Sequence, residues 1–196
     1  MRQICEESVI LSVNCAYGHD AELGSVSREF HPGELCALTG PNGCGKSTLL
    51  STIAGELSPL RGEVLLGETP TSSGTTGVAL IAEPVFLPDL TVGEHLSLAG
   101  IDRDAAVEEW ALHNLVAAPL WALSSGQRQR AYLGAQLGVR APVLLIDEPE
   151  RHLDEDWTDF LIARLQDIAR EGVCVLVATH SPRVVAGCGD VLRLGE

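Results

Sequence analysis

The sequence predicts an α/β fold in which a mostly parallel central sheet is preceded by an antiparallel β layer and interrupted by an inserted helical lobe. A glycine-rich stretch at 40–48 lies between a strand-like apolar run and a helical run. Apolar residues fall at helical spacing through 93–118, and from residue 131 helix and strand patterns alternate, as in a parallel sheet with crossover helices. The chain of 196 residues is too short for two full α/β domains. We therefore expect one domain over 1–196, with the helical lobe inserted at about 84–138.

The segments around the glycine-rich stretch follow from their own patterns. Short strand-like runs separated by turn signals predict the antiparallel layer, and longer apolar runs that alternate with helical periodicity predict the parallel sheet. A stretch rich in Gly, Ser and Thr predicts a surface loop. The expected elements are strands at 8–13, 34–38, 78–82, 143–146 and 173–178, a helix end, a turn and a further strand within 55–66, a helix at 156–170 and a loop at 67–77.

The glycine-rich stretch has the complete pattern G-x-x-x-x-G-K-[ST]. Its glycines let the backbone N–H groups surround phosphate oxygens, Lys46 supplies a compact positive charge for the β- and γ-phosphates, and Ser47 offers a hydroxyl to Mg²⁺. The following helix adds the positive end of its dipole. The stretch predicts a P-loop nucleoside triphosphatase fold, with the triphosphate bound by Gly40, Pro41, Asn42, Gly43, Cys44, Gly45, Lys46, Ser47 and Thr48.

An acidic pair ends the apolar run at 143–146. Asp147 is expected at the carboxyl edge of the sheet, where ligands of open α/β folds bind and where it can hold Mg²⁺. Glu148 is then placed to orient or deprotonate the attacking water. Alone, such a pair would indicate a solvated acidic turn or a helix cap. Beside the phosphate loop, it predicts a Mg²⁺-dependent hydrolytic site.

The composition limits the partners and the compartment. Thirteen basic residues against 27 acidic ones give a formal net charge of −14, which repels polyanions, so no nucleic-acid partner is expected. The six cysteines form no C-x-x-C pair, and Cys44 lies inside the glycine-rich stretch, where a disulfide would distort the site. We therefore expect reduced thiols and a cytosolic compartment. No apolar run approaches the roughly 20 residues of a membrane-spanning helix, so we expect the chain itself to be soluble.

The segment 123–130 reads Leu-Ser-Ser-Gly-Gln-Arg-Gln-Arg. Alone, it would indicate a helix N-cap, and a helix N-terminus is also an anion site that can meet a γ-phosphate. Together with the glycine-rich stretch and the acidic pair, it resembles the signature Leu-Ser-Gly-Gly-Gln of ABC-type ATPases, with Ser125 in place of a glycine. The resemblance covers nearly the whole chain. It implies that Ser124, Ser125, Gly126 and Gln127 bind the ATP that is held by another subunit.

The resemblance supplies further roles on individual residues. Tyr17 matches the family's aromatic residue that stacks on adenine, although an exposed Tyr in a turn would more often simply pack. Asp154 matches the loop that links two opposed sites, and His180 matches the switch histidine that contacts the γ-phosphate. Glu83, or alternatively Ala82, stands where the family has a glutamine that reaches the metal and reports to the helical lobe. We expect Glu83 still to reach Mg²⁺, but to change coupling or nucleotide preference because it adds a negative charge.

The resemblance also implies what the protein does. A head-to-tail pair of subunits would enclose two ATP molecules, and hydrolysis to ADP and phosphate would reopen it. The first hypothesis is the ATP-hydrolysing subunit of an ABC transporter, peripheral at the cytoplasmic face and coupled to separate membrane permease subunits that dock on the lobe surface at 84–115. The alternatives are a soluble ABC-type ATPase that assembles a complex, and a nucleotide-binding regulatory module without turnover. The sequence leaves open the substrate, its direction, the permease, and whether the dimer contains one chain or two.

Overall fold

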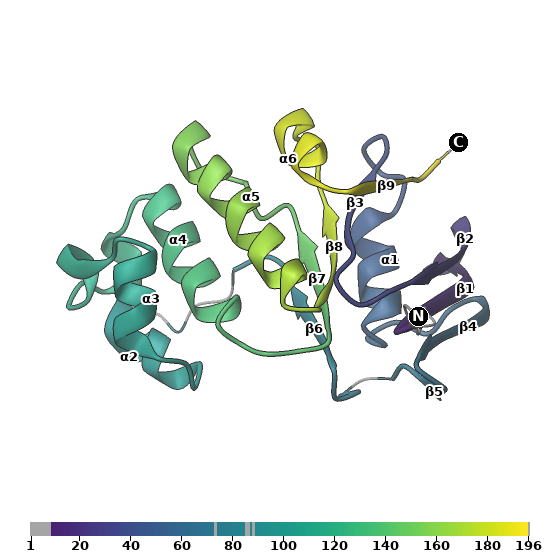
Figure 1. Ribbon diagram of the computed structural model, residues 1–196, viewed down its shortest axis with the longest axis horizontal. Coiled ribbons are helices and arrows are strands. Elements are labelled where there is room, and N and C mark those ends of the chain that lie inside the picture. The colour runs from purple at the N-terminus through teal and green to yellow at the C-terminus, as the bar shows by residue number, and fades with distance from the viewer. Residues whose placement is uncertain (1–8, 73, 85–86, 88, 196) are drawn as a thin grey trace, which may run out of the picture. The chain divides into compact units, whose positions relative to one another are not determined.

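The computed structural model describes residues 9–72, 74–84, 87 and 89–195, and the chain divides into two compact units (Figure 1). The first unit contains the chain up to Ala82 together with Ala141–Glu148 and the residues from Asp159 on. The second contains Glu83–Arg140 and Pro149–Thr158. The lobe expected at 84–138 thus falls within the second unit, which also takes in the short segment after the acidic pair.

A parallel sheet organises the first unit. Its strands lie in the order β6-β7-β8-β3-β9, and each neighbouring pair runs parallel. The central strands are almost wholly buried, as expected for a parallel sheet covered on both faces. Its strands are β3 (Leu35–Thr39), β6 (Val78–Ile81), β7 (Val143–Asp147), β8 (Cys174–Ala178) and β9 (Asp190–Arg193).

A second, antiparallel sheet lies in the same unit. Its order is β2-β1-β4-β5, and β1 forms the long pairings with both β2 and β4. Alternate residues of β1, such as Leu11 and Val13, are fully buried, so one face of this sheet contributes to the core. Its strands are β1 (Leu11–Gly18), β2 (Glu22–Phe30), β4 (Arg61–Leu66) and β5 (Thr69–Pro70).

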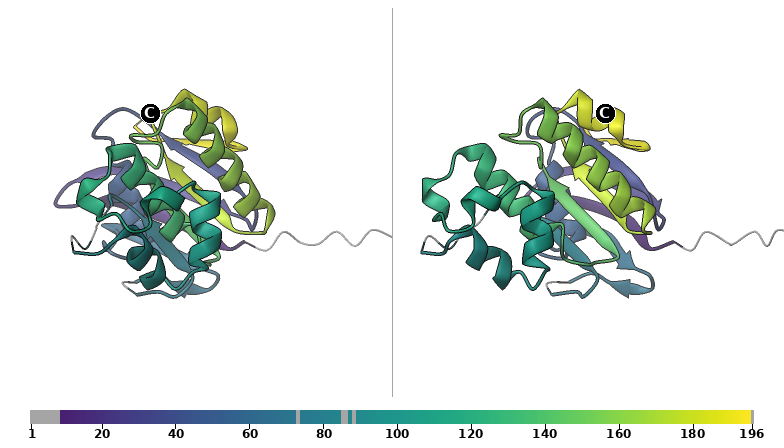
Figure 2. Two further views of the ribbon diagram at one scale, coloured as in Figure 1. Left: turned by 90° about the vertical axis from the view of Figure 1, so that its left-hand side faces the viewer. Right: turned by 60° about the vertical axis from the view of Figure 1, so that its left-hand side comes forward.

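Helices cover both faces of the parallel sheet. Helix α1 (Lys46–Ile53) buries Leu49, Leu50 and Ile53 in a core that also contains residues of both sheets. In Figures 1 and 2, α1 lies on one face, and α6 (Pro182–Gly187) lies on the other face together with the part of α5 (Glu155–Arg170) that belongs to this unit. The α/β fold class predicted from the sequence is therefore confirmed, including its parallel and antiparallel sheets.

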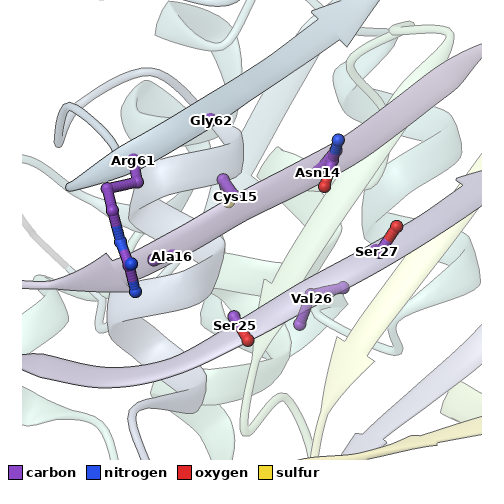
Figure 3. Close-up of a pocket in the computed structure, with 8 residues that line it drawn as sticks. All are labelled: Asn14, Cys15, Ala16, Ser25, Val26, Ser27, Arg61 and Gly62. Atoms are coloured by element: carbon purple, nitrogen blue, oxygen red, sulfur yellow. The ribbon is translucent and has the colours of Figure 1, made fainter.

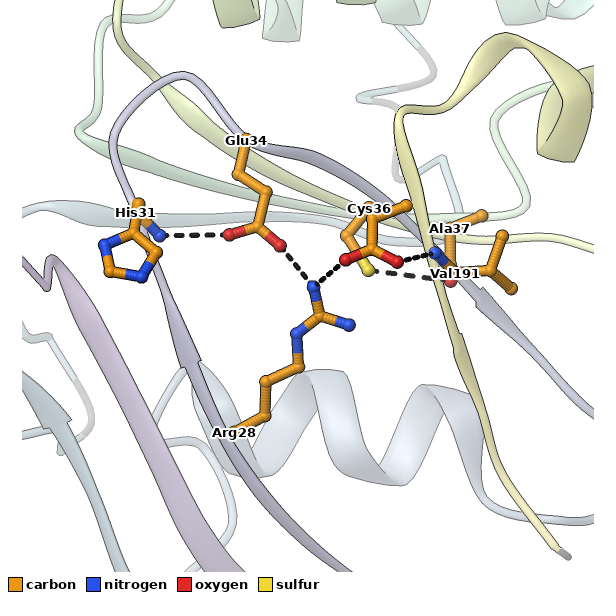
Figure 4. A network of polar contacts seen from close by, with 7 residues as sticks. Arg28, His31, Glu34, Cys36, Ala37 and Val191 are labelled. Atoms are coloured by element: carbon orange, nitrogen blue, oxygen red, sulfur yellow. Dashed lines mark hydrogen bonds and ion pairs between the residues drawn. The ribbon is translucent and has the colours of Figure 1, made fainter. Parts of the chain in front are cut away.

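An ionic network ties β2, β3 and β9 together (Figure 4). The Arg28 guanidinium pairs with Glu34 and with Asp190, and it lies 4.7 Å from the centre of the Phe30 ring. Glu34 also accepts a hydrogen bond of 3.0 Å from the backbone N–H of His31. The backbone N–H of the next residue, Val191, and the Arg28 guanidinium both lower the pKa of Asp190. The network therefore fixes the edge strand β9 to the strand that leads into the phosphate loop.

The second unit is helical. The side chains of Thr91 and Glu94 form a capping box at the start of α2, and Asp102 caps α3. An isolated antiparallel β-bridge pairs Thr91 with Pro119, so the start of α2 lies beside the segment that precedes the second 3₁₀ turn. Its elements are α2 (Val92–Leu98), α3 (Arg103–Glu109), the 3₁₀ turns His113–Leu115 and Leu120–Ala122, and α4 (Ser125–Gln136).

The structure refines several sequence expectations. The first strand begins at Leu11, while Ser8, at the start of the expected 8–13 strand, lies outside the described residues. Residues 69–70 of the expected 67–77 loop form the short strand β5. The described cysteines are free thiols, and burial raises the pKa of Cys36 and Cys174 to about 12. Within the part of the chain that the structure describes, no helix is both long and apolar enough to cross a bilayer.

Candidate functional site

The phosphate loop joins the carboxyl end of β3 to the first residue of α1. Lys46 opens that helix and is only 6% exposed. Its Nζ donates to the carbonyl oxygens of Gly40 at 3.1 Å and Pro41 at 3.4 Å. The ammonium group therefore lies across the loop, and a phosphate oxygen that displaces these carbonyls would meet a charge that is already in place.

Two glycines of the loop adopt conformations that other residues avoid. Gly45 has φ of 90°, and a Cβ there would lie 2.8 Å from Cε2 of Tyr17. Gly40 has φ of 151°, and a Cβ there would lie 2.6 Å from the carbonyl oxygen of Leu194. Both backbone conformation and space therefore require glycine. This explains why the sequence pattern predicts the loop so well.

Tyr17 lies beneath the loop. It is 1% exposed, and its hydroxyl donates to the carbonyl oxygen of Cys44 at 3.2 Å. Burial, and then the neighbouring Cys44 and Cys15 thiols, raise the pKa of the Tyr17 hydroxyl. Adenine stacking by Tyr17 stays a prediction. The burial of the ring does not favour it, because a stacking ring needs an exposed face. Leu23 on β2 is 44% exposed, and its Cδ1 lies 3.0 Å from the position of a Cβ on Gly45, so it offers apolar surface beside the loop.

Asp147 ends β7, and the Ser47 side chain lies close enough to its carboxylate to act on the pKa of that group. Burial raises the pKa of this carboxyl, the polar Ser47 side chain opposes that rise, and the charge of Glu148 adds to it. The charges of Lys46 and His180 then lower it. The predicted magnesium residues Ser47 and Asp147 therefore meet at the same edge of the sheet as the phosphate loop.

Glu148 and His180 lie side by side at the ends of β7 and β8. His180 Nε2 is 3.5 Å from Glu148 Oε1, and both side chains are about two-fifths exposed, at 42% and 40%. Glu148 has φ of 46°, a left-handed conformation that costs a non-glycine residue on the order of 1 to 3 kcal/mol. Its backbone N–H donates to the carbonyl oxygen of Ala178 at 2.9 Å, which holds it there. The strained backbone keeps a carboxylate beside an imidazole at an accessible position.

A hollow of about 360 Å³ adjoins these groups. Thr39 and Gly40 line it from the end of β3, and Thr179 and His180 from the end of β8. It lies at the carboxyl edge of the parallel sheet, where ligands of open α/β sheets bind.

The predicted signature residues lie in the second unit. Ser124 is the N-cap of α4, and its hydroxyl accepts from the backbone N–H of Gln127 at 3.2 Å. The Gln127 side chain in turn accepts from the backbone N–H of Ser124 at 2.9 Å. The pattern S-x-x-Q in the sequence is typical of such a capping box, and the N-cap that the segment suggests is thereby confirmed. Ser124 and Ser125 are exposed, so the capped helix presents both side chains to solvent.

The two residues predicted for coupling are also exposed and also belong to the second unit. Glu83 is its first residue. The Asp154 carboxylate accepts from the backbone N–H of Trp157 at 2.9 Å in the first turn of α5. The roles of Glu83 as a metal ligand and of Asp154 as a link between sites stay predictions. Of the segment after Glu83, residues 85, 86 and 88 lie outside the described part of the chain.

Residues 23–151 match the sequence model of the ABC transporter family. The chain belongs to this family. The hemin import ATP-binding protein HmuV of Pseudomonas aeruginosa is 34% identical over 200 residues, which cover 90% of this chain and 78% of that protein. The cytochrome c biogenesis ATP-binding export protein CcmA of Rhodopseudomonas palustris is 33% identical over 183 residues, which cover 89% of this chain and 92% of that protein.

Solved structures agree with this family membership. An ATP-binding subunit of an ABC transporter aligns with a TM-score of 0.83 at 27% identity, over 94% of this chain and 85% of that one. A bacterial ABC transporter cassette of dimeric structure aligns with a TM-score of 0.81 over 94% of both chains, and at 22% identity this likeness shows the fold alone. The predicted function is confirmed at this level: the chain is the ATP-binding ATPase subunit of an ABC transporter. The relatives named above are transporter components and do not favour the assembly-ATPase alternative.

The donor set of this ABC subunit fits Mg²⁺. Mg²⁺ prefers oxygen ligands and is commonly held by one or two carboxylates together with substrate phosphates. The Ser47 hydroxyl and the Asp147 carboxylate are neighbours, and the buried carboxylate has a raised pKa that a cation would lower. These oxygens are the ones that would hold the ion.

A second hollow, of about 280 Å³, lies over β1, β2 and β4 of the antiparallel sheet (Figure 3). Asn14, Ser25 and Ser27 line it, and Arg61 crosses one end while pairing with Glu22. None of the residues that line it comes from the phosphate loop, the acidic pair or the segment with His180. It is therefore not part of the nucleotide site.

Proposed function

We propose that this ABC subunit is a Mg²⁺-dependent ATPase whose site is completed by a second subunit, and that its closing and opening drive permease subunits at the cytoplasmic face of a membrane. The observation that carries the proposal is the meeting of Lys46, Ser47, Asp147, Glu148 and His180 at one edge of the parallel sheet. These groups supply a phosphate cradle, metal ligands, a base and a polar partner for that base.

In the proposed reaction, the loop and Lys46 hold the β- and γ-phosphates, so that the reacting phosphorus stays fixed while charge develops on its oxygens. Bound Mg²⁺ would neutralise part of that charge. Glu148 orients the attacking water in line with the leaving group and accepts its proton as the new P–O bond forms and the bond to ADP breaks. His180 Nε2 lies 3.5 Å from Glu148 Oε1, and in the proposed reaction His180 donates to a γ-phosphate oxygen. The products are ADP and phosphate.

The second subunit contributes the anion-binding end of its α4. Ser124 and Ser125 are exposed at the first turn of that helix, where free backbone N–H groups and the helix dipole favour an anion. In a head-to-tail dimer, Ser124–Gln127 of one copy would cover the γ-phosphate held by Lys46 of the other. ATP then stabilises the closed dimer because it binds both surfaces at once.

The variant Ser124→Asp separates the helix cap from this trans role. Aspartate caps helices as well as serine does, so α4 should keep its stability. The new carboxylate would face the γ-phosphate of the partner copy, and like charges at close range repel. We expect a change in Tm of no more than about 2 °C and loss of ATP-dependent dimerisation, measured by size-exclusion chromatography with Mg²⁺ and a slowly hydrolysed ATP analogue.

Ser124→Ala is the matched control for the cap. It removes the capping hydroxyl at a cost of about 1 kcal/mol but adds no charge, so it should dimerise better than Ser124→Asp despite a lower Tm. Equal dimerisation of Ser124→Asp and wild type would contradict the trans role.

The permease partner is tested by purification from membranes. A tagged protein carrying Glu148→Gln, which should hold ATP without turnover, is extracted in mild detergent with Mg·ATP and then identified with its bound proteins. We expect a polytopic integral membrane protein in stoichiometric amount. Its loss in a lobe variant such as Leu98→Glu, at a side chain that is 67% exposed, would place the contact on the lobe. Recovery of the protein only in membrane-free complexes would contradict the transport proposal.

A further inference from the structure

A cation and two aromatic rings stack inside the second unit. The guanidinium carbon of Arg130, on α4, lies 4.3 Å from the centre of the Trp157 ring, in the first turn of α5. The Trp157 ring stacks on Trp110, with centroids 6.2 Å apart and planes inclined by 11°. Arg130 also donates through Nη1 to the Trp110 carbonyl oxygen at 3.2 Å. Trp110 is 1% exposed, so this stack has a rigid base.

The segment 149–158 contacts α4 at two further places. Gln129, which is 5% exposed, donates through Nε2 to the Pro149 carbonyl oxygen at 2.9 Å. Gly126 approaches the His152 carbonyl oxygen so closely that a Cβ there would lie 2.9 Å from it. These contacts explain why the segment belongs to the helical unit, although it directly follows the strand that carries Asp147.

Asp154 is hydrogen-bonded to the residue that carries the stacked ring and to the residue after it. Asp154 accepts from the Trp157 backbone N–H, and Thr158 donates through its hydroxyl to the Asp154 carbonyl oxygen at 2.7 Å. Burial lowers the pKa of Arg130, and the Asp154 carboxylate opposes that shift, so the two charges attract. If the Trp157 ring were removed, Arg130 would stay partly buried without its aromatic partner. Its guanidinium would then be held less firmly near the Asp154 carboxylate.

We propose that Trp157 and Arg130 are positioning residues, which hold the segment 149–158 on α4 so that Asp154 and Ser124–Gln127 approach a second copy as one body. This inference rests on the composite site proposed above. Neither side chain needs to touch the nucleotide. Their effect is to hold the segment 149–158 and the start of α4 in one fixed arrangement. The dimer then closes without the entropy cost of ordering these two stretches relative to each other.

The test compares Trp157→Leu with Trp157→Phe, and Arg130→Met with Arg130→Lys. Leucine and methionine remove the stack, phenylalanine keeps an aromatic face, and lysine keeps the charge but not the planar group. We expect Trp157→Leu and Arg130→Met to lower kcat about tenfold and to weaken ATP-dependent dimerisation, with the Kd of the single chain for ATP unchanged within about twofold. Trp157→Phe should recover most of the loss, and Arg130→Lys less.

Arg170→Met is the matched control for loss of an arginine. Arg170 pairs with Asp167 at the exposed end of α5 in the first unit, so kcat and dimerisation should equal those of wild type. A variant that weakens ATP binding by the single chain as much as it lowers kcat would show a general disturbance and overturn the positioning role.

Hydrogen exchange of the nucleotide-free chain separates this inference from the proposed function. In Trp157→Leu, amides of 149–158, such as that of Leu153, which donates to the Glu150 carbonyl at 3.0 Å, should exchange on the order of tenfold faster, while those of β7 and β8 stay unchanged. Unchanged exchange overturns the inference whether or not the protein hydrolyses ATP. Faster exchange with normal kcat and dimerisation also overturns it. A wild-type protein that neither dimerises nor hydrolyses ATP would instead overturn the proposed function.

Discussion

Replacing Glu148 by glutamine is expected to lower the rate of ATP hydrolysis by about 10² to 10³-fold while ATP binding stays within about twofold of wild type. The amide cannot take the proton of the attacking water, but it has the size of the carboxylate and can adopt the same strained backbone at φ of 46°. Lys46, Ser47 and the loop are untouched. Phosphate release at saturating Mg·ATP and equilibrium binding of a fluorescent ATP analogue measure the two quantities separately.

The matched control is Glu171→Gln, which makes the same chemical change at an exposed residue just after α5. Its turnover should equal that of wild type. If Glu148→Gln hydrolysed ATP within twofold of wild type, Glu148 would not be the base, and the protein would need another acceptor for the proton.

Local patterns predicted the parts of the fold whose causes are local. The phosphate loop requires glycine because of its own backbone and immediate neighbours, so the pattern alone places β3, the loop and the start of α1. The run at 143–146 is apolar because both faces of β7 are buried, and the first polar residue, Asp147, then marks the carboxyl edge. Such features survive in the sequence because each depends on a few neighbouring residues.

Features that depend on distant contacts were not predictable. The pattern of β2 does not alternate cleanly, so its nine residues give no clear strand signal until β1 pairs with them. Tyr17 is buried because Gly24 and Gly45 leave room for its ring, and those glycines lie on a different strand and in the loop. The sequence pattern suggested an exposed ring, since a turn follows Tyr17 directly.

The segment 149–158 is the clearest example. Its sequence position, directly after the acidic pair, suggests that it belongs with the parallel sheet. Gln129, Arg130 and Gly126 assign it to the helical unit instead, through contacts across about twenty to thirty residues, such as the Gln129–Pro149 bond with a separation of 20. No periodicity or motif marks such pairings, because they depend on how α4 and the first turn of α5 meet.

Replacing Lys46 by alanine is expected to weaken ATP binding by at least about 30-fold, because removal of one partner of a buried charge pair typically costs 2 to 5 kcal/mol. In the nucleotide-free protein, Lys46 donates to the carbonyl oxygens of Gly40, which is half-buried, and Pro41, which is exposed. Water can replace the lost donor at both oxygens, so Tm should change little. Isothermal titration with Mg·ATP measures the loss. Ser51→Ala, farther along α1 at an exposed pair with Glu56, is the matched control and should bind as wild type does.

Lys46 also allows a direct test in the unaltered protein, because it is the only lysine in the chain. Reductive methylation with ¹³C-formaldehyde can therefore label one side-chain amine, apart from the N-terminal amine. Since Lys46 is 6% exposed, labelling should already be slow without nucleotide, and Mg·ATP should slow it further, on the order of tenfold, while the N-terminal amine reacts at an unchanged rate. The N-terminal signal serves as the internal control for reagent and pH. Equal labelling of Lys46 with and without Mg·ATP would mean that the phosphates do not contact this ammonium group, and the assignment of the loop as the triphosphate cradle would fail in the wild-type protein, independently of any effect of the alanine on folding.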